Sequence, residues 1–227
     1  MTTREAPSQT ETLSIDVWSD VMCPFCYMGD TALTQAIEQS PHKENVVVRY
    51  HSYQLMPELP HDHPVDLAEI LASKRGFSRA QAVAMNNGVA ERGRALGLEY
   101  RFDRAQTINT RTAHRLIHFA DTAGGQHQMV DRLFRAYFTD GLNIADHHVL
   151  TGLAAEIGLD PVAAAAALDS ADLDLAIDDD IQQARALGIT GVPFFVLDGA
   201  FAVSGAQPVD AFVRAIDHAW AQRFVRA

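Results

Sequence analysis

The chain has 227 residues, 48% of them hydrophobic, and a formal net charge of −11 at pH 7. This length suits one large domain or a domain with a sizeable insertion, and it allows a real hydrophobic core. The acidic balance argues against nucleic acid and anionic membranes as partners, because both carry negative charge.

Residues 1–12 form a polar N-terminal stretch that contains Arg4, Glu5 and Glu11. They lack the apolar run that a secretory signal or a transmembrane helix requires. We therefore expect a disordered tail on a cytoplasmic protein. In that reducing compartment a cysteine pair should cycle between thiol and disulfide, since structural disulfides rarely persist there.

The first predicted strand begins at Leu13, where apolar and polar residues start to alternate as far as Trp18. Farther along, Leu33 and Ala36 recur at helical spacing, and this helix should end near Ser40. The only two cysteines of the chain lie in the turn between the strand and the helix.

These cysteines, Cys23 and Cys26, are three residues apart, the spacing of a redox pair. A thiol at a helix N-terminus faces unpaired N–H groups and the positive end of the helix dipole, and both favour the thiolate. Pro24 suits the first helical position, because the N–H that it lacks would have no partner there. We predict that Cys23 attacks a disulfide and that Cys26, one turn further in, resolves the mixed disulfide.

Two other interpretations of the pair are weaker on the residues alone. Inert buried cysteines would need no fixed spacing. A structural zinc site needs four ligands, and the chain has no second cysteine pair. The nearby His61-Asp62-His63 stretch lies in a proline-rich loop without the spacing of a ligand set. We therefore predict no metal site.

A second strand is predicted from Asn45 to Tyr53, a stretch rich in valine and aromatic residues. With the first strand and the helix between them, it would form a parallel βαβ unit. The next residues, as far as Pro64, contain three prolines and cannot continue a central strand. We place the first boundary of the fold there.

Helical signals dominate from residue 65 to about residue 188. Ser78 and Gln81 predict a capping box, and Asp146 and Asp160 predict helix caps. Apolar stripes at helical spacing predict further helices, with members at Ala113, Leu116, Ile117 and Ala120, at Val130, Leu133, Phe134, Tyr137 and Phe138, and at Leu173, Ile177, Ile181, Ala184 and Leu187.

Several ionisable residues of this region have no partner of suitable spacing. His114 and His118 lie four residues apart, but no third ligand accompanies them, so we expect surface or rim histidines. The run Asp178–Asp180 is expected to be a solvated helix face.

Two aspartates lie close to the cysteines in sequence. Asp16 and Asp20 are near enough to relay a proton to the resolving cysteine, but Asp20 could equally cap the turn. We assign neither residue to the site.

Strands return at the C-terminal end. Residues 194–197 and 200–203 flank Asp198-Gly199, a strong signal for a tight hairpin turn. A final helix places Phe212, Ile216 and Trp220 on one face. The predicted order is therefore βαβ, then a long run of helices, then ββα, with halves of one domain at 13–60 and 189–227 and a helical insertion at 61–188.

This outline resembles the DsbA family, whose thioredoxin fold is split by a helical insertion. The motifs narrow the resemblance to the FrnE-like branch; they are Asp20–Gly29, Asn109-Thr110 with Ala113–Leu116, Gly188–Val196, and Ser204–Gln207. Phe25 stands where that branch usually has tryptophan. Some members carry an additional C-terminal cysteine pair, and this chain has none.

The resemblance implies an α/β protein, a thioredoxin fold interrupted by a large all-helical insertion. It implies a thiol-disulfide oxidoreductase acting on protein or small-molecule disulfides or dithiols, with no bound cofactor and with glutathione as a redox partner. It also implies a cis peptide between Val192 and Pro193, packed against the dithiol. There the backbone of Val192 could pair with an extended substrate, so Phe25, Val192 and Pro193 are the expected substrate-binding residues.

Two alternatives stay open at this point. The same split fold resembles kappa-class transferases and 2-hydroxychromene-2-carboxylate isomerases, which depend on glutathione. Those enzymes usually have serine where Cys23 stands, and they would leave Cys26 unexplained. The other alternative is a non-catalytic holdase that binds clients in an apolar groove near Phe25 and the insertion.

Overall fold

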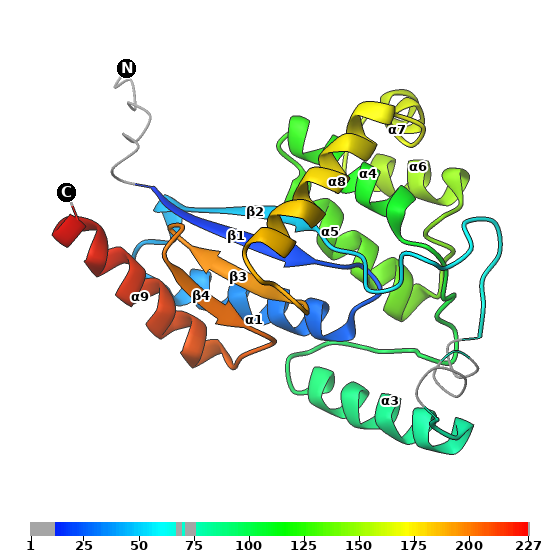
Figure 1. Cartoon of the computed structure of the whole chain (residues 1–227), viewed down its shortest axis with the longest axis horizontal. Helices are drawn as coiled ribbons and strands as arrows, with labels where there is room; N and C mark the ends of the chain where they lie inside the picture. Colours follow the sequence, from blue (N-terminus) through cyan, green and yellow to red (C-terminus); the bar gives the residue numbers. More distant parts are fainter. Residues whose placement is uncertain (1–11, 67–69, 71–75, 227) are drawn as a thin grey trace.

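The computed structural model describes residues 12–66, 70 and 76–226 (Figure 1). The predicted disordered tail, residues 1–12, lies outside this part of the chain except for Thr12. Within the described residues, none of the helices combines the length and the apolar character that crossing a membrane demands.

The elements follow the predicted order of strands and helices. In chain order they are β1 (Leu13–Ser19), α1 (Pro24–Gln39), the 3₁₀ turn η2 (Lys43–Asn45), β2 (Val46–Ser52), α3 (Arg79–Arg94), α4 (Arg111–Thr122), α5 (Gln126–Arg135), the π-helical turn η3 (Ala136–Asp140), α6 (His147–Glu156), α7 (Pro161–Ala167), α8 (Ala171–Ala186), β3 (Phe194–Leu197), β4 (Phe201–Ser204) and α9 (Val209–Arg226).

The four strands form one sheet in the order β2-β1-β3-β4. β1 and β2 are parallel and are joined through α1, whereas β3 runs antiparallel to both β1 and β4. This is the predicted βαβ…ββα arrangement, and helices α3 to α8 are inserted between its two halves. The fold class is therefore confirmed: a thioredoxin fold with a large helical insertion.

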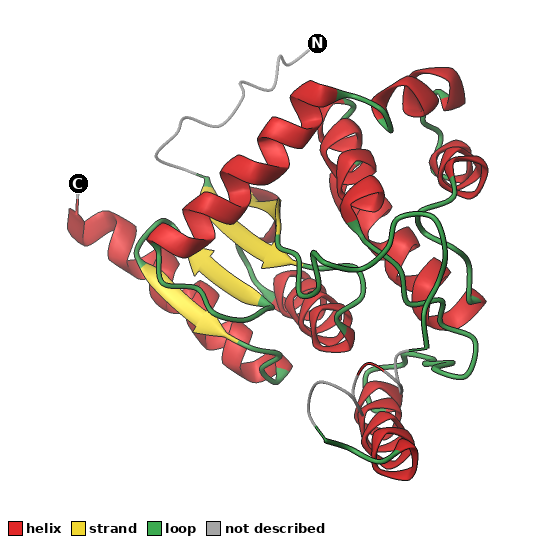
Figure 2. Ribbon diagram, turned by 45° about the vertical axis from the view of Figure 1, so that its right-hand side comes forward, coloured by secondary structure: helices red, strands yellow, loops and turns green. Residues whose placement is uncertain are grey.

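Alternation along the strands divides the sheet into two buried faces. Ile15 and Val17 of β1 point into the main core, where Phe195 of β3 meets Phe212 of α9 edge to face, with ring centroids 4.8 Å apart. Trp18 points the other way and packs with a residue of α8. Helices α1 and α9 therefore cover one face of the sheet and α8 covers the other (Figures 1 and 2).

The helix caps and the hairpin turn that the sequence predicts are present in the structure. Ser78 and Gln81 make both hydrogen bonds of a capping box at the start of α3. Asp146 and Asp160 accept hydrogen bonds from backbone N–H groups at the starts of α6 and α7. Between β3 and β4, Asp198 adopts a left-handed φ of 53°, and Gly199 follows with a φ of 64°. These are the dihedrals of the primed turns that suit a tight hairpin.

The apolar stripe predicts one helix as far as Phe138, but the α-helix ends earlier. Helix α5 ends at Arg135 and the chain continues as the π-helical turn η3. Two consecutive aromatic residues of this turn, Tyr137 and Phe138, are both buried. Gly141 ends the turn in a left-handed conformation.

Candidate active site

The two cysteines lie where α1 begins, at the end of the sheet. Cys23 is the N-cap residue, with an extended backbone, and Pro24 occupies the first turn of the helix. The backbone N–H of Cys26 donates to the carbonyl oxygen of Cys23 over 3.0 Å. The predicted position of both thiols, one at the helix start and one a turn further in, is therefore confirmed.

Both sulfurs are free thiols and both are covered by protein. Cys23 is 3% exposed and Cys26 is 1% exposed. Burial, and then the neighbouring Cys23, raise the pKa of Cys26 well above its usual value, while hydrogen bonds of the Asp20 backbone and the Ser19 side chain oppose the shift. Cys26 is therefore a neutral thiol near pH 7. Cys23 is close enough to affect its pKa.

A loop from the C-terminal half of the chain meets the first thiol. The Sγ of Cys23 donates to the carbonyl oxygen of Val192 over 3.6 Å. The Val192–Pro193 peptide is cis, as the resemblance implies. Gly29 of α1 makes this approach possible, because a Cβ there would lie 2.9 Å from Cγ of Pro193.

The insertion holds both residues between the cysteines. The hydroxyl of Tyr100 donates to the carbonyl oxygen of Pro24 over 2.6 Å. The guanidinium of Arg92, on α3, lies 5.3 Å from the ring centre of Phe25. Burial, followed by the charges of Tyr27 and the two cysteines, raises the pKa of Tyr100. The sequence did not reveal either contact.

A buried contact between His114 and Asp20 corrects one prediction. His114 was expected at the surface, but it is 2% exposed, and its Nε2 lies 3.4 Å from Oδ1 of Asp20. The other carboxylate oxygen of Asp20 accepts from the backbone N–H of Leu55 over 2.7 Å. The expectation was wrong because His114 precedes Ile117 by three residues and so borders the buried stripe of α4.

A second group of buried polar residues, on the α8 side of the sheet, corrects another prediction. Asp180 was expected in a solvated acidic run, but it is 5% exposed. It accepts from the backbone N–H of Ser52 over 2.7 Å and pairs with the rings of His51 and His118. Its neighbours Asp178 and Asp179 are exposed, as predicted. Side chains of β2 and α4 therefore bury the end of the acidic run.

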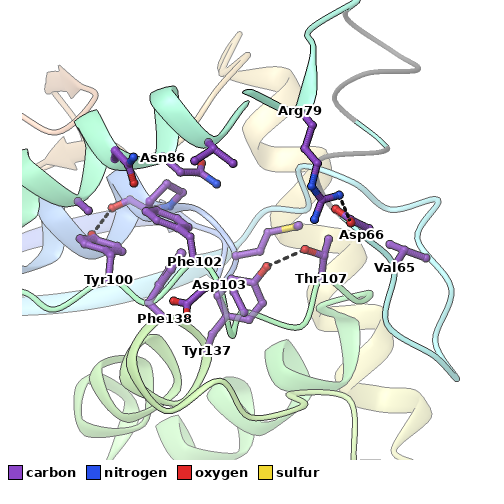
Figure 3. Close-up of a pocket in the computed structure, with 16 residues that line it drawn as sticks. Val65, Asp66, Arg79, Asn86, Tyr100, Phe102, Asp103, Thr107, Tyr137 and Phe138 are labelled. Carbon is purple, nitrogen blue, oxygen red and sulfur yellow. Dashed lines mark hydrogen bonds and ion pairs between the residues drawn. The ribbon is translucent and has the colours of Figure 1, made fainter. Parts of the chain in front are cut away.

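A cavity of about 750 Å³ lies beside the start of α1, with Met22 and Pro24 in its lining (Figure 3). Helix α3 forms one wall, and the residues around Tyr100 and Phe138 form the other. A smaller recess of about 270 Å³ adjoins Val192 and Pro193. In the described part of the chain, His, Cys, Asp and Glu residues do not gather into a group that could hold a metal ion.

Comparison with known proteins gives one family and several relatives. A family model described as a DSBA-like thioredoxin domain matches residues 14–217. An uncharacterized protein of Bacillus subtilis (strain 168), YwbO, is 29% identical over 208 residues, which are 90% of this chain and 96% of YwbO.

Two solved structures extend the comparison to the fold. The probable DsbA oxidoreductase SCO1869 from Streptomyces coelicolor is 35% identical, with a TM-score of 0.87 over 92% of this chain and 91% of its own. The cytosolic disulfide reductase DsbM from Pseudomonas aeruginosa is 22% identical, with a TM-score of 0.68 over 90% of this chain and 97% of its own. At that identity, the likeness to DsbM is one of fold alone.

Proposed function

The chain belongs to the DSBA-like thioredoxin domain family, and from that premise we propose that it is a thiol-disulfide oxidoreductase whose reactive pair is Cys23 and Cys26. The observation that carries the proposal is the position of Cys23. It caps a helix, its sulfur lies 3.6 Å from the carbonyl oxygen of Val192, and the second thiol is one turn away. The motifs of the FrnE-like branch support a place within that group.

The reaction that this arrangement supports has two thiol-disulfide exchanges. The Cys23 thiolate attacks a substrate disulfide, which releases one substrate thiolate and leaves a mixed disulfide. Cys26 then loses its proton and attacks the Sγ of Cys23, which releases the second substrate thiolate and leaves a Cys23–Cys26 disulfide. The reverse sequence oxidises a dithiol.

Substrate contacts are assigned to Phe25, Val192 and Pro193. The backbone of Val192 already accepts a hydrogen bond from the attacking thiol, so an extended substrate pairing with Val192 would lie directly against that sulfur. Phe25 is partly exposed beside the same thiol and offers an aromatic contact.

The cycle requires an external thiol but no bound cofactor. Two molecules of glutathione would restore the dithiol and leave as glutathione disulfide. DsbM has also been crystallised with GSH, which favours this choice of partner. A cytoplasmic location suits a reductase, because the thiol pool there supplies the electrons.

The assignment is tested by following insulin disulfide reduction with the wild type, Cys23→Ser and Cys26→Ser. We expect Cys23→Ser to fall to the uncatalysed rate, because serine cannot form the mixed disulfide. Cys26→Ser should stall and accumulate a covalent adduct with substrate, visible by mass spectrometry under non-reducing conditions.

The alternatives have their own signatures in the same experiment. Full turnover by Cys26→Ser without an adduct would favour a glutathione-dependent isomerase or transferase, which needs one thiol at most. Suppression of client aggregation that survives the loss of both cysteines, without reductase activity in the wild type, would favour a holdase.

A further inference from the structure

The exchange chemistry leaves the cavity beside the helix start unused. Its volume of about 750 Å³ falls within the range of roughly 300–1,000 Å³ that small-molecule sites occupy. Met22 and Pro24, the residues on either side of Cys23, are among its lining residues. A molecule in the cavity would therefore contact the chain on either side of the attacking cysteine, which does not itself line the cavity.

One wall of the cavity is a packed set of aromatic rings (Figure 3). The rings of Tyr100 and Phe102 stack with centroids 5.3 Å apart, and Phe138 meets both edge to face, at 5.0 Å and 5.8 Å. Tyr100 and Phe138 are buried, and the hydroxyl of Tyr100 is held by the carbonyl oxygen of Pro24. This wall is therefore preformed, and Phe102, the partly exposed ring of the three, is the one on which a flat ring can stack.

The opposite wall is a face of α3 made of small, neutral side chains. Val83, Asn86, Asn87 and Ala90 line the cavity at helical spacing. Val83 is 50% exposed although it lines the cavity, so the aromatic wall does not cover it. The amides of the asparagines can hydrogen-bond a ring nitrogen or a carbonyl group.

Charge at the cavity favours an uncharged occupant. The charged residues that line it in the described part of the chain are Asp66, Arg79 and Asp103. Asp66 and Arg79 form an ion pair of 2.6 Å, and Asp103 lies 3.9 Å from Arg101. The guanidinium of Arg79 is already engaged by a carboxylate, and a carboxylate or phosphate ligand would also face the negative charge of Asp103.

Access to the sulfur favours a small substrate over a folded protein. Cys23 is 3% exposed, and its sulfur lies against the carbonyl oxygen of Val192. A disulfide on a rigid protein surface would have to displace several covering groups, whereas a small molecule in the cavity needs only a shift of Met22 or Pro24, which line the cavity on either side of Cys23.

Resting on the proposed function, we propose that the preferred substrate is a low-molecular-weight disulfide that carries an uncharged aromatic group, and that this group stacks in the cavity between α3 and Tyr100, Phe102 and Phe138. The exchange itself is unchanged: the Cys23 thiolate takes one half of the disulfide, and the other half leaves as an aromatic thiolate.

The test compares two uncharged disulfides, dipyridyl disulfide and hydroxyethyl disulfide, in single-turnover reactions with the reduced protein. Each rate constant is divided by that of a free thiol such as N-acetylcysteine, which removes the intrinsic reactivity of the disulfide. We expect this normalised rate to be at least about tenfold higher for the aromatic disulfide. A ratio near one would overturn the proposal.

A matched pair of variants on α3 locates the effect. Ala90→Trp fills the cavity and should remove most of the aromatic preference. Ala84→Trp makes the same change at an exposed position of the same helix that does not line the cavity, and should keep the preference. Equal ratios in the two variants would contradict the assignment, provided that circular dichroism shows both to be folded.

Binding without redox chemistry separates this proposal from the oxidoreductase assignment. Dipyridylethane replaces the disulfide of the probe by two methylene groups, and its binding to the Cys23→Ser/Cys26→Ser double variant can be followed by calorimetry. We expect binding there that Ala90→Trp abolishes and Ala84→Trp retains. If the reduced wild type reacts with neither disulfide while this binding persists, the proposed function fails and the aromatic site stands. Absence of binding would overturn the site.

Discussion

Gly29 lets the two halves of the site meet. Its Cα faces the loop that carries Pro193, and an added Cβ would lie 2.9 Å from Cγ of Pro193 and 3.0 Å from Cζ of Phe195. Both neighbours are fixed, one in the loop beside the thiol and one in the buried core of the sheet. Packing therefore requires a glycine at position 29. The helical backbone of α1 would itself accept another residue there.

Replacing Gly29 by alanine should destabilise the protein. Overpacking a tight contact costs about 1–3 kcal/mol, which exceeds the gain of up to about 1 kcal/mol from the better helix propensity of alanine. Displacement of Pro193 should also slow the exchange reaction. Gly152→Ala is the control, because this residue of α6 has open space around the Cβ position and should gain stability of about 0.5–1 kcal/mol. Urea unfolding of both variants checks the pair, and a gain in Gly29→Ala would show that the contact relaxes freely.

At the scale of elements, His51 joins the sheet to the insertion. Its ring lies between Asp16 of β1, at 2.9 Å, and Asp180 of α8, at 2.7 Å, and stacks on Trp18 with centroids 4.5 Å apart. Burial disfavours its charge, but the hydrogen bonds with both carboxylates prevail and raise the pKa of His51 to about 9. For Asp180, burial is likewise outweighed by His118, His51 and the Ser52 backbone, and the pKa falls to about 2.

These shifts give a pH dependence of stability with a definite sign. Because the pKa of His51 rises on folding from 6.5 to about 9, its contribution is complete below pH 6.5 and is lost as the pH rises through 9. For Asp180 the contribution is present above pH 3.8 and is lost as the pH falls through 2. The contact between β2 and α8 should therefore be strongest between these limits, in mildly acidic solution.

The measurement compares urea unfolding of the wild type and His51→Gln from pH 6 to pH 10. We expect the wild type to lose about 1–3 kcal/mol more than the variant over this interval. His147→Gln, at an exposed position of α6, should follow the wild type. Parallel curves for the wild type and His51→Gln would mean that the histidine carries no charge in this contact.

At the scale of the whole molecule, one continuous core joins the thioredoxin fold to its insertion. Buried residues of β1, α1 and α9 belong to the same cluster as those of α4, α5 and α6. The contact between α1 and α5 is aromatic, with Tyr27 stacked on Phe134 at 5.0 Å. The insertion therefore packs against the thioredoxin fold through apolar side chains, and α3 lies at the margin of the molecule (Figure 2).

Such a core predicts a single cooperative unfolding transition. Of the two tryptophans, Trp220 on α9 reports on the thioredoxin fold and Trp18 on the contact of the sheet with α8, whereas circular dichroism is dominated by the helices of the insertion. The two signals should change at the same urea concentration. Phe134→Ala should shift both together by about 3–5 kcal/mol, because it opens a cavity at the junction. Transitions that separate in either protein would show two independently folding parts.

Local chemistry in the sequence determined much of this protein. Features that depend on residues close together in sequence were predictable. They are the alternation of β1, the helical stripes, the capping box of Ser78 and the turn at Asp198-Gly199. The position of Cys23 at a helix start belongs to the same class. The cis peptide followed from the family resemblance and not from spacing.

Only the tertiary structure decided which polar residues are buried and what surrounds the thiols. His114 and Asp180 occupy sequence patterns typical of exposed helix faces, and they are covered because α4 and α8 pack against other elements. The contact of Val192 with Cys23 joins residues 169 positions apart, and the lining of the cavity comes from five segments of the chain. Periodicity describes one face of one element at a time, whereas burial and cavities arise from pairs of faces that the chain brings together only on folding.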